Sequence, residues 1–90
     1  MAAPPDNFVP LAPDLAVEVL SPSDRMADAM SKVTMYRQAG VRLVWLVDPA
    51  TLTVTIFRQD AAPKMVGEGD TLDGGDVLSD FSVPVAEIFA

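Results

Sequence analysis

The apolar residues of this 90-residue chain follow two different periods, which predict strands interrupted by one helix. Residues 14–20 place apolar side chains at every second position, the pattern of a strand. Residues 24–39 repeat apolar side chains every three or four positions, as an amphipathic helix does. Further strands are predicted at 41–47 and 52–57, a short edge strand at 64–68, and a last helical turn or short strand at 83–89.

Turn-forming residues mark the boundaries of these elements. Ser21-Pro22 ends the first strand, Ser23 is a good N-cap for the helix, and Gly40 supplies its stop. Asp48-Pro49 separates two strands that should form a hairpin. The apolar stripe expected to face the sheet consists of Met26, Ala29, Met30, Val33 and either Tyr36 or Arg37.

These elements predict an α/β domain of the α+β type, with a mixed sheet ordered strand, helix, strand, strand. Residues 41–47 are apolar on both faces, which is typical of a central strand that needs cover on both sides. One helix covers one face, and the sequence provides no evident cover for the other. We therefore expect a partner chain, most simply a second copy in a homodimer formed through the uncovered sheet.

Composition narrows the class of protein. Ninety residues allow one small domain, and residues 1–13, with four prolines, predict an extended arm ahead of a domain at 14–90. The absence of cysteine excludes disulfides, and no segment resembles a signal peptide or a membrane span. We expect a soluble, cytoplasmic protein. A net charge of −7 argues against a simple nucleic-acid binder.

Glu18 is the acidic residue at the centre of an otherwise apolar strand, and such a carboxylate is costly to bury without a partner. Lys32 lies on the following helix, on a stripe that Asp28 and Tyr36 share at spacings of four, and can lean towards Glu18. Asp14 shares the strand face of Glu18. Two carboxylates beside a cation could hold a hard divalent metal ion, which could activate water against a phosphodiester.

Other interpretations of these residues stay open. Asp14 and Glu18 are about 13 Å apart on an ideal strand that rises roughly 3.3 Å per residue, too far to share one metal ion without a bend. Asp14 can simply begin the strand. Glu18 can form an ordinary ion pair with Lys32 or face water on an edge strand. The absence of His and Cys excludes the usual zinc sites and His-based triads.

Beyond these physical patterns, the chain resembles a known bacterial family in its motifs and their spacing. The motifs are PDLAVEVLSPSDR from Pro13 to Arg25, then Lys32, Tyr36, Ala39-Gly40-Val41, and VWLVDP from Val44 to Pro49. The segments Gly69–Leu72 and Leu78–Phe81 and the final Ile88-Phe89 pair resemble the same family's tail. The family is the Uma-two family of restriction-endonuclease-like proteins.

The resemblance implies a PD-(D/E)XK nuclease fold and magnesium-dependent hydrolysis of phosphodiester bonds in DNA. Glu18 matches the acidic residue of the D/E-X-K element and, with Mg²⁺ as cofactor, would be a metal ligand. Leu20 stands where that element has its lysine, and Lys32 matches a helical lysine that takes over the role. Asp14 matches the aspartate of the family's Pro-Asp-Leu segment and is the second candidate ligand and catalytic residue.

The resemblance covers only the C-terminal half of the family's domain, so residues 14–90 are predicted to be a truncated version of it. The missing half would hold part of the core and a further metal ligand. Two hypotheses follow. The chain is a metal-dependent nuclease, inactive if the missing half is essential, or it is a non-catalytic interaction module that dimerises.

Overall fold

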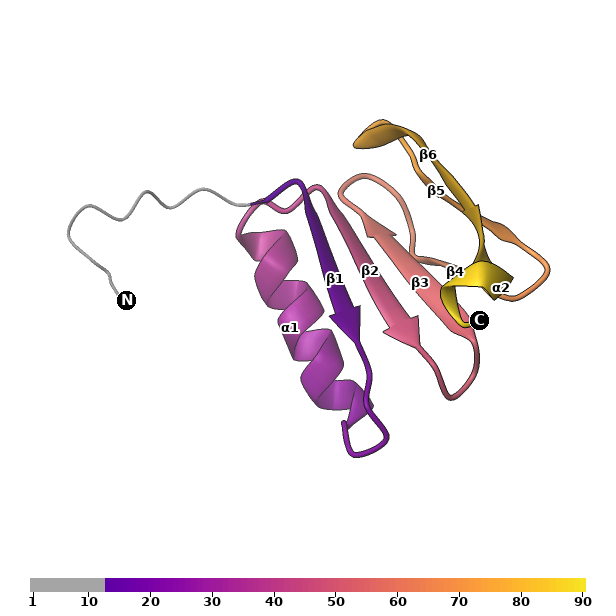
Figure 1. Ribbon diagram of the computed structural model, residues 1–90. Coiled ribbons are helices and arrows are strands. Elements are labelled where there is room, and N and C mark those ends of the chain that lie inside the picture. The colour runs from indigo at the N-terminus through magenta and orange to yellow at the C-terminus, as the bar shows by residue number, and fades with distance from the viewer. Residues whose placement is uncertain (1–12) are drawn as a thin grey trace.

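The computed structural model describes residues 13–90, which form a four-stranded sheet, a smaller two-stranded sheet and two helices (Figure 1). The arm predicted for residues 1–13 lies, apart from Pro13, outside the described residues. In chain order the elements are β1 (Leu15–Val19), α1 (Met26–Gln38), β2 (Leu43–Asp48), β3 (Thr53–Arg58), β4 (Lys64–Val66), β5 (Thr71–Gly74), β6 (Leu78–Pro84) and α2 (Val85–Ile88).

The larger sheet has the order β1-β2-β3-β4. β1 and β2 pair in parallel, with Glu18 opposite Leu46, and the remaining neighbours are antiparallel. The predicted order of strand, helix, strand and strand is therefore confirmed. So is the central place of β2, whose first five residues are all buried.

Helix α1 packs on one face of this sheet through small and branched side chains. Ala29 and Val33 are buried against Val44, Leu46 and Phe57. The predicted stripe is wider than the observed contact, because the side chains of Met26 and Met30 are exposed instead of facing the sheet. Gly40, with φ of 95°, ends the helix as predicted, since this left-handed conformation favours glycine.

The start of α1 differs from the prediction that Ser23 caps it. The helix begins at Met26 after an extended Arg25, and no side chain caps it. Asp24 instead accepts a hydrogen bond of 2.8 Å from the backbone N–H of Ser21, closing the turn after β1. This hydrogen bond lowers the pKa of Asp24 below its ordinary value. The polar residues between β1 and α1 thus build a turn rather than a helix cap.

The other face of the sheet is covered by the chain's own C-terminal segment, which corrects the expectation that it lacks cover (Figure 1). Strands β5 and β6, which the sequence analysis did not predict, pair with each other and lead into α2. With side chains from β2, β3 and β4 they form one core, whose buried members are Leu43, Trp45, Val47, Val54, Ile56, Val66, Leu72 and Val85. The central strands therefore need no partner chain on this face.

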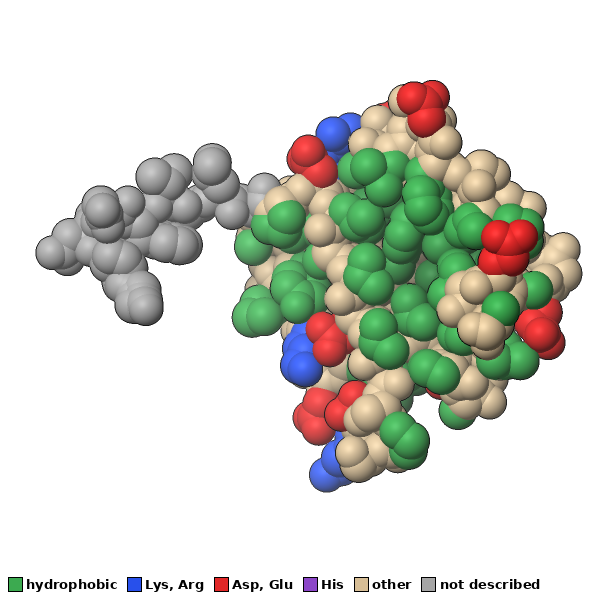
Figure 2. All heavy atoms as spheres, in the orientation of Figure 1, with side chains coloured by type: hydrophobic (Ala, Val, Ile, Leu, Met, Phe, Trp, Pro, Cys, Tyr) green, Lys and Arg blue, Asp and Glu red, His purple; other side chains and the backbone are tan. Residues whose placement is uncertain are grey.

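The cover is incomplete over β1, the edge strand of the larger sheet within the described residues. Val17 and Val19 point to the same face as the core just described, yet they are 49% and 56% exposed. Figure 2 shows hydrophobic side chains gathered over the strands in the centre of the molecule. No helix within residues 13–90 is both long and apolar enough to cross a membrane.

Candidate functional site

Glu18 lies near the end of β1 and points to the face that α1 covers. Side chains alternate along a strand, and its neighbours on the same face, Ala16 and Leu20, pack against the helix-side core. The Glu18 side chain is only 16% exposed. The strand therefore places a carboxylate between the sheet and the helix, where it requires a partner.

Two side chains of α1 bind the Glu18 carboxylate. The Lys32 ammonium lies 3.2 Å from Glu18 Oε2, as an ion pair and a hydrogen bond. The Tyr36 hydroxyl donates a hydrogen bond of 3.3 Å to the other oxygen, Oε1. Lys32 and Tyr36 are four residues apart, one turn of the same helix, so both reach a single carboxylate.

The contact also affects the protonation of the lysine. The hydrogen bond to Glu18 and the negative charge of its carboxylate raise the pKa of Lys32 above its ordinary value. Lys32 therefore carries its positive charge at neutral pH. Its side chain remains 54% exposed, which leaves the ammonium free to turn towards a bound anion.

Asp14 belongs to a different set of contacts. It lies one residue before β1, its side chain is 71% exposed, and its carboxylate is 3.9 Å from the guanidinium of Arg42. Arg42 also approaches Asp76, at 3.7 Å. The role of Asp14 as a second metal ligand stays a prediction. Its side chain contacts Arg42 and neither Lys32 nor Tyr36.

A divalent metal ion would find one suitable ligand here. Within residues 13–90, no group of three or more acidic, His or Cys side chains is close enough to hold a metal ion together. Mg²⁺ commonly keeps several waters and is bound by one or two carboxylates together with substrate phosphate. Glu18, a largely buried carboxylate, fits the place of one such ligand.

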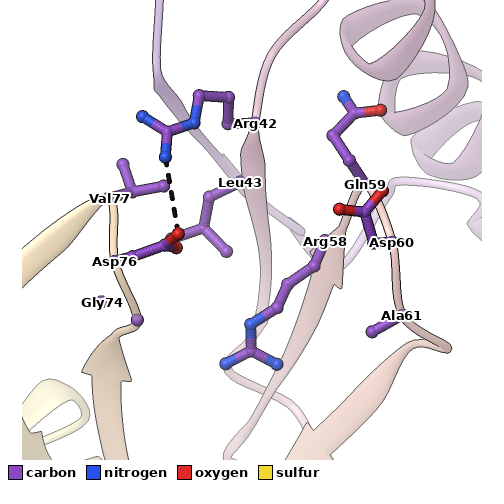
Figure 3. A pocket seen from close by; sticks show the side chains of 10 residues that line it. Arg42, Leu43, Arg58, Gln59, Asp60, Ala61, Gly74, Asp76 and Val77 are labelled. Carbon is purple, nitrogen blue, oxygen red and sulfur yellow. Dashed lines mark ion pairs between the residues drawn. The ribbon is translucent and has the colours of Figure 1, made fainter.

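The pocket drawn in Figure 3 lies apart from this carboxylate. It has a volume of about 290 Å³ and lies between the ends of β2 and β3 and the β5–β6 turn. Arg42 and Arg58 line it together with Asp60 and Asp76, so its formal charges balance. Neither Glu18 nor Lys32 borders it, and it adds no group to the candidate site.

Glu18 and Lys32, both predicted from the sequence as site residues, are in contact in the structure. Tyr36 was predicted to lie on the same helical stripe as Lys32 but was given no part in the site. The missed signal is the spacing of four between Lys32 and Tyr36, which directs both side chains to the same strand residue.

Three comparisons with known proteins bear on this arrangement. The sequence profile of a family described as "Uma2: Putative restriction endonuclease" matches residues 2–86. The fold is similar to the crystal structure of a putative nuclease belonging to DUF820 from Anabaena variabilis, with a TM-score of 0.79 and 21% sequence identity. The match covers 88% of this chain and 45% of that one, so the chain spans less than half of that protein's length. No protein of curated function matches the chain.

The comparisons confirm the resemblance and the fold class that the sequence predicted. The profile match extends over nearly the whole chain, and the structural match shows the same restriction-endonuclease-like architecture. An identity of 21% establishes the fold alone. The roles of Glu18, Lys32 and Asp14 stay predictions.

Proposed function

Because the chain belongs to the Uma2 family of putative restriction endonucleases, we propose that it is a metal-dependent nuclease-type protein acting on phosphodiester bonds in DNA. The proposal assigns residues 14–90 to the C-terminal part of a restriction-endonuclease-like domain. It also assumes the cytoplasmic location predicted from the sequence, where DNA is accessible.

The observation that carries this proposal is the contact between Glu18 and Lys32. A strand carboxylate beside a helical cation combines a hard oxygen ligand with a donor able to stabilise charge on phosphate. The two groups come from consecutive elements that pack on each other through a buried core. Their relative position is thereby fixed by the fold.

In this proposal Glu18 binds Mg²⁺, and Asp14 is a weaker candidate for a second ligand. When bound, Mg²⁺ supplies an activated water and neutralises charge on the phosphate. Lys32 faces the phosphate and stabilises the charge that develops as phosphorus becomes pentavalent. Tyr36 keeps its hydrogen bond to Glu18. Any further ligands are waters, substrate oxygens or groups outside residues 13–90.

Metal binding and DNA cleavage by the chain test the proposal. We expect Mn²⁺, as a paramagnetic substitute for Mg²⁺, to broaden the NMR signals of Glu18 and of the neighbouring Lys32. This broadening should occur at lower Mn²⁺ concentrations than that of acidic residues elsewhere in the chain. We also expect Mg²⁺ to support nicking of supercoiled plasmid DNA, with EDTA abolishing it. Broadening without nicking would mean that the chain keeps the metal site and lacks activity. The absence of both results would refute the proposal.

A second candidate function is a non-catalytic interaction module that dimerises. The specific observation is the exposure of Val17 and Val19 on an edge strand, because exposed apolar edges favour pairing with another chain. In this proposal the interface is the β1 edge rather than the whole sheet face, since β5, β6 and α2 cover the remainder.

Sedimentation velocity at micromolar concentration tests the dimer. We expect the chain to sediment as a dimer and Val17→Lys to sediment as a monomer, because a lysine on the edge opposes strand pairing. Met65→Lys is the matched control, since Met65 is also exposed but lies on β4, at the other edge of the sheet. A well-folded wild-type monomer would refute this candidate.

A further inference from the structure

We propose that Tyr36 is a positioning residue for Glu18. Its hydroxyl fixes the orientation of the carboxylate through Oε1 and leaves Oε2 as the oxygen at which a metal ion replaces the Lys32 ammonium. The inference deepens the proposed function and rests on it for the metal ion. The orientation of Glu18 by Tyr36 can be measured without metal.

The division of the carboxylate between two donors is the first observation. Each oxygen of Glu18 is contacted by a different side chain, Oε2 by Lys32 at 3.2 Å and Oε1 by Tyr36 at 3.3 Å. The two donors differ in charge. An incoming metal cation competes with the ammonium for the same negative charge, whereas the neutral hydroxyl can stay in place, since an ionised carboxylate has about four acceptor sites.

The burial of the two donors is the second observation. Tyr36 is half-buried and packs against the helix-side core. Lys32 is 54% exposed and has a long flexible side chain. A packed aromatic ring loses little further freedom when its hydroxyl binds, whereas holding the lysine in one place costs more side-chain entropy. The tyrosine is therefore the rigid contact and the lysine the exchangeable one.

These observations give an order of events at the site. With a divalent ion held at Oε2, the Lys32 ammonium would leave that oxygen and become available to the phosphate. Tyr36 keeps Glu18 in the same orientation throughout. Hydrogen bonds to a metal-bound carboxylate commonly act in this way, and their loss costs roughly 10- to 100-fold in metal affinity or activity.

The orientation is tested first in the metal-free chain. Tyr36→Phe removes the hydroxyl and keeps the ring, so the core packing is retained. We expect ¹³C relaxation to show a lower order parameter for the Glu18 side-chain methylenes in Tyr36→Phe than in the wild type. We expect a smaller decrease in Lys32→Met. An unchanged order parameter in Tyr36→Phe, at equal thermal stability, would overturn the positioning role.

The exchange at Oε2 is tested with Mn²⁺. We expect Tyr36→Phe to bind Mn²⁺ about tenfold more weakly than the wild type at equal thermal stability. Tyr36 is the only tyrosine of the chain, so the ultraviolet resonance Raman signature of a donating phenol reports on it alone. That signature should persist when Mn²⁺ binds, and its loss would overturn the proposed exchange at Oε2. Failure of the wild type to bind Mn²⁺ would refute the proposed function, while the Glu18 order parameter would still decide the role of Tyr36.

Discussion

Leu72→Ala should destabilise the chain by about 2–5 kcal/mol, the usual cost of removing a large buried aliphatic side chain. Leu72 is 1% exposed and belongs to the core that joins β5 and α2 to the larger sheet. Small domains are stable by only about 5–15 kcal/mol, so this loss would remove a large part of the total. Urea denaturation followed by the fluorescence of Trp45, the only tryptophan, measures it.

Leu78→Ala is the matched control for this prediction. Leu78 lies on β6, the strand that pairs with β5, but it is 38% exposed. Its truncation should cost less than half as much as that of Leu72, because fewer contacts and less buried area are lost. Equal effects of the two substitutions would mean that the β5–β6 pair does not cover the sheet as described.

Leu72 lies on β5, the first strand that was not predicted from the sequence. The segment from β1 to β3 was predicted closely. Its apolar patterns continue over many residues, and its turns contain recognisable residues such as Gly40 and Pro49. β5 has only four residues, both β5 and β6 contain several polar residues, and the glycines and acids between them indicate only a turn. Without them the second face of the sheet was left uncovered in the prediction.

The turn between β5 and β6 shows why its glycines matter beyond loop formation. Gly74 is buried beside a register shift in the β5–β6 pair. A Cβ atom there would lie 2.6 Å from the carbonyl oxygen of Leu78, a backbone atom that cannot easily move. Gly74 therefore allows the two strands to approach each other closely, a requirement that periodicity does not reveal.

The width of the buried face of α1 was predicted wrongly for a different reason. Met26 and Met30 have helical spacing with Ala29 and Val33, and periodicity alone cannot say how wide the buried stripe is. The helix lies against few strands, so only the centre of the stripe is buried. The face of β1 to which Glu18 points, by contrast, could be predicted from the sequence. Strand alternation determines the face of a side chain once the neighbouring apolar residues are known.

Glu18→Gln should reduce any metal-dependent cleavage of DNA by on the order of 10³-fold, because the charge stabilisation that a metal ion provides is worth several kcal/mol. The amide keeps the size of the side chain and can still accept a hydrogen bond from Tyr36, but it has no negative charge for a cation. Plasmid nicking rates in saturating Mg²⁺ measure the effect. Glu68→Gln, at an exposed glutamate in a turn, is the matched control and should cleave as the wild type does.

The double variant Glu18→Gln with Lys32→Met separates a catalytic pair from a merely structural one. Lys32→Met alone leaves a carboxylate that is 16% exposed without its cation, so it should destabilise the fold more than Glu18→Gln does. Combining the two removes both charges and should recover stability, as expected for residues in direct contact. Activity should not recover, because neither the metal ligand nor the phosphate-facing cation is restored. Recovery of cleavage together with stability would mean that the pair only holds α1 against β1.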